Sequence, residues 1–552
     1  MSAKDASKDS TATANTVGAP INQPPTAPLR WNGWGDPALA KQLPLALRTL
    51  LPLKLGRIQK PAPATAIDKV AVAASALSAE DRAAFATVIG ETHLGVDNES
   101  RLRHAGGRST PDLLRKRASA QDTPDGVLSP ATHEEVLALL RAAAERDIAV
   151  IPFGGGTSVV GALDPERGSH RAVVAIDLTR MSGLISLDEV SGQARMFAGT
   201  TGPEAERLLG QHGYELGHFP QSFLYATLGG FAAARSSGQN SSGNGRFDDM
   251  VLGMRVATPS GEFTFGVSPG SSVGPDLTKL FLGSEGIFGI ITELVLRVHP
   301  QPATRSFEAW SFPDFETGAE ALRQVAQLRT RPTVIRLSDE AETSVSLAQH
   351  GKIGKALSKG CSAVTVFEGD PADVAARHAA TAEILKRVGA SSEGSAPAES
   401  WINGRFGAPY LRDSLLDHGV FCETLETATT WTGLHTLKER VTAALQDGFA
   451  EHGAKAMVLC HVSHIYPSGA ALYFTIAAGI PGDDLEVWAK VKASVNDTIV
   501  ANGGTLSHHH GVGRDHAPWI KQEIGEAGVR ILRAVKAELD PSGIMNPGAV
   551  IG

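Results

Sequence analysis

Apolar residues along the chain recur at two spacings, one typical of helices and one typical of strands. Between residues 136 and 143 they fall on one helical face, and acidic residues at 134–135 precede them, which suits the positive end of a helix. Ser129 and Pro130 supply a predicted cap and first turn. Because the apolar run 148–153 follows directly, the pattern predicts a helix that leads into a buried strand.

Four further apolar runs have the length and composition of strands. They span residues 173–178, 194–198, 250–258 and 290–298, and a helical pattern at 202–209 lies among them. The first part of this series runs helix, strand, loop, strand, strand, helix. This order predicts an α+β fold rather than a doubly wound parallel sheet.

A glycine-rich loop follows the first predicted strand. Residues 152–161 contain three consecutive glycines and then Thr157 and Ser158. Glycine lets a backbone approach a ligand closely, and successive N–H groups in such a turn can hold an anion, so the loop is a candidate phosphate cradle. No helix opens at the third glycine, which argues against a Rossmann site, and no Gly-Lys-Ser/Thr ending indicates a P-loop. A glycine turn between two core strands is the alternative.

Two further glycine-rich segments span residues 220–245 and 283–292. Both are flanked by predicted strands, unlike an unstructured linker of the same composition. We therefore expect both segments to line a ligand.

The composition is that of a globular protein without a nucleic-acid partner. The chain has 552 residues, 42% hydrophobic and 20% charged, which is enough for several domains. The net charge of -8 provides no basic field for a polyphosphate chain. Three cysteines without paired spacing predict neither a disulfide framework nor a cysteine zinc site and suit a reducing cytoplasm. No signal segment or apolar run of about 18 residues is present, so we expect no integral membrane segment.

The N-terminal 120 residues are predicted to form two regions. Residues 1–28 contain few large apolar side chains, so we expect a disordered tail; residues 29–120 are expected to be a helical region, with alanine-rich helices at 65–95. The leucine-rich segment 43–55 is either a helix packed on the body or an amphipathic patch in contact with a bilayer. The basic stretch 101–117 is expected to stay solvated, with the lining of a rim as the alternative.

Together the three glycine-rich loops resemble the FAD-binding segments of vanillyl-alcohol-oxidase type flavoproteins, and the ending 539–548 is similar to the common terminus of these enzymes. The resemblance implies non-covalently bound FAD. It assigns to FAD Pro152, Phe153, Gly154, Gly155, Gly156, Thr157, Ser158, Pro220, Gln221, Ser222, Thr227, Gly229, Gly230, Ala233, Ala234, Arg235, Ser236, Glu285, Gly286, Ile287, Gly289, Ile290 and Ile291.

The same resemblance implies the domain organisation. An FAD-binding domain of two α/β subdomains would occupy residues 121–300, and an α+β cap domain that binds the substrate would occupy 301–500. The C-terminal segment 501–552 would return to the FAD domain and the active site.

Three consecutive histidines, His508, His509 and His510, form the most specific string in the chain. In an extended strand only His508 and His510 would share a face, which leaves a metal ion short of ligands, so no metal is expected here. Imidazole titrates near neutral pH, and clustered imidazoles hold one another partly neutral. The string therefore predicts acid–base chemistry or polarisation of a substrate.

The histidine string closely resembles that of the alkylglycerone-phosphate synthase (alkyl-dihydroxyacetone-phosphate synthase) family within this superfamily. Residues 31–36 are similar to an early tryptophan motif of the family. By the same resemblance Arg336 is its essential arginine, Arg412 its substrate-binding arginine and Tyr473 its catalytic tyrosine. The similarity covers nearly the whole chain after residue 28.

The chain departs from this family at three places. Residues 220–223 replace a more acidic segment, residues 514–516 stand where animal members carry a different basic pair, and no Ser-Lys-Leu-type ending is present. The first departure affects fine contacts with the flavin. The last argues for a bacterial, cytoplasmic setting.

A D-2-hydroxy-acid dehydrogenase or oxidase of the same fold is the alternative function. Those relatives typically carry Gly-Glu-His-Gly in place of residues 508–511, and a metal-binding segment with acidic residues in the cap. The corresponding residues 461–473 contain no Asp or Glu, and Tyr473 stands about where the last histidine of that segment would be. A flavin-fold binding protein without chemistry, a third class, would leave the matching arginines, tyrosine and histidines unexplained.

The family resemblance implies ether-lipid synthesis, in which a transferase exchanges the acyl chain of acyl-dihydroxyacetone phosphate for a fatty alcohol while FAD undergoes no net redox change. The planar guanidinium of Arg412 suits a phosphate dianion. Tyr473 and one histidine would move protons, and cations such as Arg336 would have to lower the tyrosine pKa for it to act as a base near neutral pH. The expected partners are a lipid-like phosphorylated substrate and a fatty alcohol, with peripheral membrane contact and a homodimer as further expectations. Which histidine is the base, and the length of the alcohol, stay open.

Overall fold

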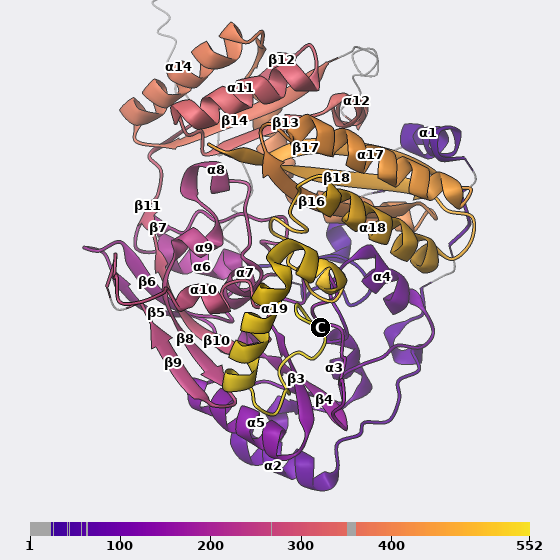
Figure 1. Cartoon of the computed structure of the whole chain (residues 1–552), viewed down its shortest axis with the longest axis vertical. Coiled ribbons are helices and arrows are strands. Elements are labelled where there is room, and N and C mark those ends of the chain that lie inside the picture. The colour runs from indigo at the N-terminus through magenta and orange to yellow at the C-terminus, as the bar shows by residue number, and fades with distance from the viewer. Residues whose placement is uncertain are drawn as a thin grey trace, which may run out of the picture.

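The computed structural model describes residues 24–25, 27–40, 42–43, 45–56, 58–61, 64–266, 268–349 and 360–552. The predicted disordered tail, residues 1–28, lies outside the described residues apart from 24, 25, 27 and 28. Two sheets of four and five strands lie in the lower half of Figure 1, and a sheet of seven strands forms the upper half. Helices and sheets are segregated, which confirms the α+β class.

The first sheet carries the first glycine loop. Its order is β1 (Leu94–Gly95), β2 (Gly126–Leu128), β4 (Ala172–Asp177), β3 (Ile148–Phe153), with β2, β4 and β3 parallel and β1 antiparallel to β2. Helices α2 (Ala79–Ile89) and α5 (His133–Glu145) share one apolar core with it. The predicted helix and strand are present, but the helix cap is Thr132 rather than Ser129, because the Thr132 hydroxyl accepts the Glu135 N–H three residues into the turn.

The basic stretch 101–117 is buried, so the expectation of a solvated stretch was wrong. It forms α3 (Asn98–Arg103) and α4 (Thr110–Arg117), and Arg101, Arg108 and Lys116 are at most 3% exposed. Their side chains donate to backbone carbonyls, which replace part of the water that these cations lose on burial. The Arg108 N–H donates to the Ser158 carbonyl, so the stretch supports the first glycine loop from behind.

The second sheet is antiparallel and holds the other two glycine-rich segments. Its order is β5 (Leu184–Asp188), β6 (Gln193–Phe197), β10 (Ile290–Arg297), β8 (Val251–Thr258), β9 (Gly261–Phe265). Helices α6 (Gly202–Gly210) and α7 (Leu228–Ala234) pack on it. Strand β5 was not predicted, because its side chains are mostly exposed and carry no buried apolar run. The small elements nearby are β7 (Tyr214–Glu215), α8 (Ser241–Asn244), α9 (Phe247–Met250), α10 (Thr278–Phe281) and β11 (His299–Pro300).

The seven-stranded sheet is antiparallel and covers the glycine loops from above. Its order is β15 (Ser391–Gly394), β12 (Thr304–Phe312), β14 (Cys361–Gly369), β13 (Val334–Ser338), β17 (Lys455–Tyr466), β18 (Gly469–Gly479), β16 (Phe421–Thr430). Helices α11 (Phe315–Leu328), α14 (Pro371–Arg387), α17 (Leu434–Glu451) and α18 (Asp484–Ala501) share a single core with the sheet, on its outer face (Figure 1). The remaining helices here are α12 (Glu340–Gln349), α15 (Ala396–Gly404) and α16 (Ala408–Leu416).

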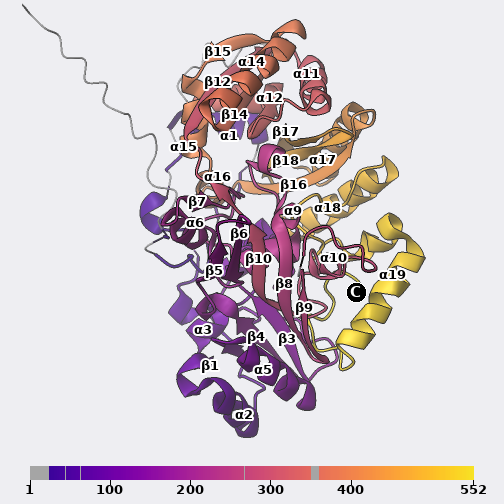
Figure 2. The same ribbon diagram turned by 90° about the vertical axis from the view of Figure 1, so that its left-hand side faces the viewer.

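Segments near both ends of the described chain connect the upper and lower halves of the molecule. Near the N-terminus, α1 (Leu45–Leu55) packs on β17 and β18 of the upper sheet, far from the elements that follow it in sequence (Figure 1). At the other end, α19 (Ile520–Leu539) runs down the side of the lower half, and Met545 joins the first sheet next to Val150 (Figure 2). Among the described residues, no helix is long and apolar enough to cross a membrane.

Candidate active site

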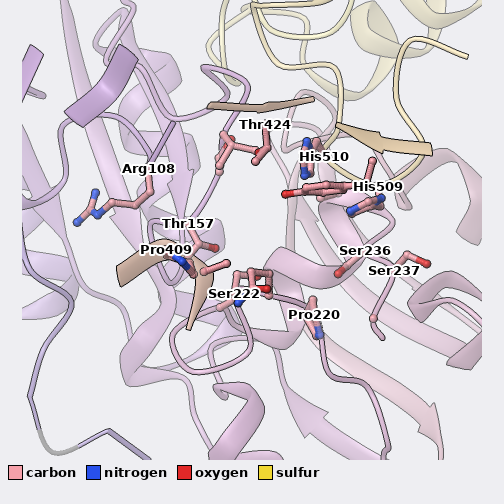
Figure 3. A pocket seen from close by; sticks show the side chains of 18 of the residues that line it. Arg108, Thr157, Pro220, Ser222, Ser236, Ser237, Pro409, Thr424, His509 and His510 are labelled. Carbon is pink, nitrogen blue, oxygen red and sulfur yellow. The ribbon is translucent and has the colours of Figure 1, made fainter. Parts of the chain in front are cut away.

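A cavity of about 590 Å³ lies between the lower sheets and the upper sheet. Pro220, Ser222 and Ser236 line it from the glycine-rich side, while Thr424, His509 and His510 approach from the opposite side, as Figure 3 shows. The cavity therefore brings together segments that are far apart in the sequence.

The first glycine loop is shaped so that only glycine fits. A Cβ on Gly154 would lie 2.3 Å from the Thr227 hydroxyl oxygen, and one on Gly155 would lie 2.0 Å from the Tyr225 carbonyl oxygen. Gly156 has a φ of 66°, which other residues rarely adopt. The loop is thus packed against the second segment and presents its backbone to the cavity, as a phosphate cradle requires.

The third glycine-rich segment is held by Glu285. This residue has a φ of 48°, and its buried carboxylate accepts the backbone N–H groups of Val512 and Gly513. Burial raises the pKa of Glu285 to about 7. The contact links the segment to the chain immediately after the histidines.

Almost all residues assigned to FAD line this cavity. The exceptions are Arg235 and Ile287. Arg235 pairs with Asp248 and is half exposed, whereas Ile287 is 1% exposed in the apolar core. Residues 152–158 line the cavity without interruption.

The cavity wall suits a flavin dinucleotide in its polar as well as its apolar parts. In the described part of the chain, Gln221 Nε2, Ser237 Oγ and Gln239 Oε1 are buried polar atoms at this wall without a protein partner. Such atoms favour a polar ligand, because an unpaired buried polar group is costly. Pro152 and Ile290 add apolar surface beside them. The residues present therefore fit FAD.

Three neighbouring strands, β16, β18 and β17, form the cavity wall on this side. We call three residues that are Cα partners across these strands a rung. Tyr473 is the Cα partner of Glu426 on one side and of His461 on the other, so the three side chains share one face of the sheet. Tyr473 and His461 line the cavity, whereas Glu426 is fully buried against the histidine segment. Two residues along, Thr475 is paired with Thr424 and Leu459. The first rung is ionisable, and the second is mostly hydroxyl-bearing.

The third rung is apolar. Ala477 is paired with Cys422 and Met457, and all three line the cavity. Beyond them the wall is completed by Leu43, Leu51, Leu411 and Leu415, which belong to the same apolar cluster. The cavity therefore changes from ionisable to apolar along the sheet and ends in an apolar arm beneath α1 and α16.

Tyr473 is a partly buried phenol between two imidazoles. Its ring stacks on His461 with centroids 4.9 Å apart, and on His509 with centroids 6.0 Å apart. Burial raises the pKa of Tyr473 to about 12, although a hydrogen bond with Thr424 and the charge of Arg336 both lower it. Burial outweighs these two contributions, so the phenol keeps its proton near neutral pH. The role of Tyr473 in proton transfer stays a prediction.

Arg336 is held by two partners on the cavity wall. Its Nη2 donates to Glu342 Oε1 at 2.6 Å and to His461 Nδ1 at 3.0 Å. Burial favours the neutral carboxyl, but the charges of Arg336 and His461 hold the pKa of Glu342 well below its usual range. The guanidinium is thus fixed next to the Tyr473 rung.

Arg412 lies at the cavity on α16. It donates to the Arg108 carbonyl at 2.6 Å and to Asp413 Oδ1 at 3.0 Å, and its side chain is 12% exposed. Asp413 in turn accepts the Trp34 N–H, so the early tryptophan segment supports this arginine. Arg412 is one of the residues that line the cavity.

The three histidines form a bend, not a strand. His509 and His510 line the cavity, whereas His508 turns to Tyr466, whose hydroxyl lies 2.5 Å from its Nε2. Burial lowers the pKa of all three rings, so they are neutral near neutral pH. His508 Nδ1 and His509 Nδ1 are 3.0 Å apart, within one hydrogen-bonded chain.

The argument against a metal ion assumed that residues 508–510 form an extended strand, and this assumption was wrong. The bend and strand β17 bring ring nitrogens of His464, His508 and His509 within 4.8 Å of one another, a grouping that could hold a metal ion. The expectation that no metal binds here stays a prediction.

Sequence reasoning missed the residues that hold the predicted ones in place. Glu342 pairs with Arg336, Glu426 accepts the backbone N–H groups of the histidine bend, and Tyr466 contacts His508. None lies in a recognisable motif. Glu426 and Tyr466 lie on strands β16 and β17, whereas Glu342 lies in the first turn of helix α12. The only signal for the first two was their position in strand-like segments.

Two family models match the chain. One described as "FAD binding domain" matches residues 124–265, and one described as "FAD linked oxidases, C-terminal domain" matches residues 301–550. With the glycine loops and the cavity, these matches define the chain as an FAD-dependent enzyme of the two-domain flavoprotein class.

Comparison with characterised relatives narrows the class. The chain is 31% identical to an alkyldihydroxyacetonephosphate synthase of Trypanosoma brucei brucei, over 95% of this chain and 92% of the relative. It is 32% identical to the enzyme of that name from Dictyostelium discoideum, over 95% and 93%. A solved structure titled alkyldihydroxyacetonephosphate synthase superposes with a TM-score of 0.81 at 30% identity, covering 94% of this chain and 98% of the other. The chain belongs to the alkyldihydroxyacetonephosphate synthase family, which confirms the resemblance read from its motifs.

Proposed function

We propose that this chain exchanges the acyl chain of acyl-dihydroxyacetone phosphate for a fatty alcohol, which yields an alkyl ether and a fatty acid. The observation that carries the proposal is one continuous cavity that joins glycine loops suited to FAD, a rung of ionisable side chains and an apolar arm. The names of the relatives support the same reaction. A small hydroxy acid would not fill the apolar arm, so a dehydrogenase is the weaker candidate.

The glycine loops 152–158, 220–222 and 285–291 would hold FAD, with backbone N–H groups of the first loop facing its phosphates. When bound, FAD supplies a flavin ring on which the exchange proceeds without net oxidation or reduction. We expect the link to be non-covalent, so acid precipitation should release all of the flavin. Flavin retained in the pellet would contradict this.

Tyr473 of the first rung and the cavity-facing histidines would transfer the protons of the reaction. The alcohol must lose its hydroxyl proton as the ether C–O bond forms and the acyl group departs as a carboxylate. His509 or His510, neutral and facing the cavity, can accept that proton. The phenol of Tyr473 keeps its proton near neutral pH and can donate a hydrogen bond to a substrate oxygen.

Arg412 is the proposed anchor for the substrate phosphate. A planar guanidinium makes two charge-assisted hydrogen bonds to a phosphate, and a dianion would compete for it with its single partner carboxylate, Asp413. Arg336 is fixed nearer to Tyr473 and would polarise the three-carbon unit.

The apolar arm is the proposed site for the fatty chains, and its end suggests how they enter. Leu51 lines the arm, whereas Leu53 and Leu39 on the outer side are 77% and 57% exposed. Exposed Leu53, with the exposed cations Arg48 and Lys54 on the same helix α1, favours peripheral contact with a bilayer that supplies the lipid. Binding to vesicles that is lost on changing both leucines to Ser would support this contact, whereas unchanged binding would count against it.

The remaining expectations belong to the same proposal. These are the domain boundaries at residues 120, 300 and 500, a cytoplasmic bacterial setting at the membrane periphery, and a homodimer. All three cysteines are free and buried, which suits a reducing compartment. Sedimentation of the purified protein measures the oligomeric state directly.

The competing function is tested by redox chemistry. The purified protein is mixed without oxygen with lactate, glycolate or 2-hydroxyglutarate, and the flavin absorbance is followed. We expect no bleaching and no electron transfer to a dye. Rapid bleaching by any of the three acids would favour the dehydrogenase.

A further inference from the structure

Glu426, a residue of β16 that no motif contains, organises the histidine bend. Its side chain is fully buried, and its Oε1 accepts four hydrogen bonds. The donors are the Ser507 hydroxyl at 2.8 Å and the backbone N–H groups of His508, His509 and His510 at 3.0, 3.0 and 2.9 Å. Its Oε2 also accepts the His508 N–H at 2.8 Å.

These contacts define the backbone of the bend. Successive N–H groups that point to one side form a concave site for an anion, and here the anion is a side chain of the protein itself. With three consecutive N–H groups committed to Glu426, the segment cannot extend into a strand. The bend then directs His509 and His510 towards the cavity and His508 away from it.

Glu426 also faces the imidazole rings. Its carboxylate oxygens lie 3.6 Å from His509 Nδ1 and 4.0 Å from His510 Nδ1. The other charged or titratable groups around the three rings are His464 and Tyr466 on β17, Tyr473 on β18, Lys492 on α18 and Arg246 before α9. Among these described neighbours Glu426 is the carboxylate in contact with the rings. Two other carboxylates lie close to the bend: Glu285 accepts the N–H groups of Val512 and Gly513, and Asp515 pairs with Lys492 at 2.6 Å.

We propose that Glu426 is the positioning residue of this site: it fixes the histidine bend and provides the negative charge that allows a cavity-facing imidazole to take up a proton. When His509 or His510 accepts the hydroxyl proton of the alcohol, the buried pair changes from carboxylate and neutral ring to carboxylate and imidazolium. The carboxylate of Glu426 then pairs with the new imidazolium, so the proton transfer does not leave an unpaired buried cation. This role rests on the proposed function, in which these histidines move a proton.

The test compares three variants as FAD-loaded proteins. Glu426→Gln keeps the size of the side chain and removes the charge. Its amide NH₂ is a donor and cannot accept a backbone N–H group as the replaced oxygen does. Glu426→Asp keeps the charge on a shorter side chain. Glu206→Gln is the matched control, because Glu206 is also a buried carboxylate that accepts two backbone N–H groups, those of Leu216 and Gly217, but lies away from the cavity.

The first readout is the dependence of activity on pH. A neighbouring carboxylate favours the protonated ring, so removing it lowers the histidine pKa. Activity that needs a neutral imidazole is lost as pH falls through that pKa, so Glu426→Gln should shift the acidic limb of the profile to lower pH. We expect kcat to fall about ten- to a hundred-fold, a part of what general acid–base catalysis contributes, with KM for the phosphorylated substrate little changed. Glu426→Asp should keep the limb in place, as should Glu206→Gln.

The second readout needs no substrate. In protein labelled with ¹⁵N-histidine, and with signals assigned through His509→Asn and His510→Asn, the two rings should titrate at lower pH in Glu426→Gln than in the wild type. An unchanged titration, or an acidic limb that stays in place while kcat is near wild type, would overturn the role of Glu426. A wild-type protein that forms no ether would instead contradict the proposed function, and the ring titration would still decide on Glu426.

Discussion

Burial sets the chemistry of single side chains at this site. The phenol of Tyr473 has neighbouring cations and a hydroxyl partner, yet burial raises its pKa to about 12. The same loss of water lowers the pKa of His509 and His510. At neutral pH the tyrosine therefore keeps its proton and the imidazoles are neutral. Under the proposed function, the phenol would donate and an imidazole would accept.

Replacing Tyr473 by Phe tests this division. The change removes only the hydroxyl, and the ring can still stack on His461. We expect kcat to fall about a hundred- to ten-thousand-fold, the range of general acid–base catalysis, while the flavin content stays at the wild-type level. Activity within a few-fold of wild type would show that the phenol moves no proton.

Two replacements of Arg412 separate the contribution of its charge to phosphate binding from that of its planar shape. Arg412→Ala should raise KM for the phosphorylated substrate far more than Arg412→Lys, because Lys keeps the charge and loses only the planar fork. KM for the alcohol serves as the internal control, since the alcohol carries no phosphate. Equally small effects of both variants would show that this arginine is not the anchor.

The sequence predicted the residues that face the cavity better than the residues behind them. Arg336, Arg412 and Tyr473 lie in recognisable motifs and line the cavity together. Glu342 and Glu426 are single carboxylates on otherwise ordinary segments. Their roles depend on which elements become neighbours: helix α12 places Glu342 beside Arg336, and strand β16 places Glu426 beside the histidine bend. A local sequence pattern does not contain that information.

At the scale of elements, strand register places the site. Pairing of β18 with β16 and β17 aligns an ionisable, a hydroxyl-bearing and an apolar rung along one face of the sheet. A slip by one residue would turn all of these side chains to the other face, where α17 and α18 pack. The gradient from Tyr473 to Ala477 therefore depends on the register of two strand pairs.

Ala477→Phe tests the apolar arm. The larger ring would occupy the arm at the third rung, so long-chain alcohols should lose kcat/KM while short ones keep it. Each methylene that can no longer be buried costs about 0.8 kcal/mol, or about fourfold. The measurement is kcat/KM over a series of alcohol lengths, with the volume-conserving Met457→Leu as control. A uniform loss at all lengths would place the chain elsewhere.

The local pattern of apolar residues predicted an element correctly where residues of that element alone determine its conformation. The helix before the first glycine loop was found because its apolar face is periodic, and only its cap was displaced, to Thr132. The histidine segment was misjudged as extended because its bend is imposed by Glu426, which lies 82 residues away from His508 in sequence. The basic stretch around Arg108 was misjudged for the same reason, since Arg108 is buried and donates to the carbonyl of Arg30, 78 residues away in sequence.

At the scale of the whole molecule, the cavity exists only when distant segments meet. Leu43 comes from the N-terminal part, Ala477 from the upper sheet and His510 from the segment that returns to the lower half. The order of the predicted helices and strands predicted the α+β class, and the glycine loops predicted FAD. They could not predict that α1 would cross to the upper sheet and complete the apolar arm (Figure 1).

The central claim is a non-redox exchange within this single cavity. The most direct measurement incubates the purified, FAD-containing protein with acyl-dihydroxyacetone phosphate and a long-chain alcohol, in the absence of any electron acceptor, and quantifies both products. The account predicts alkyl ether and free fatty acid in equal amounts, with no reduced flavin accumulating. Absence of ether under these conditions, together with flavin reduction by a hydroxy acid, would contradict it.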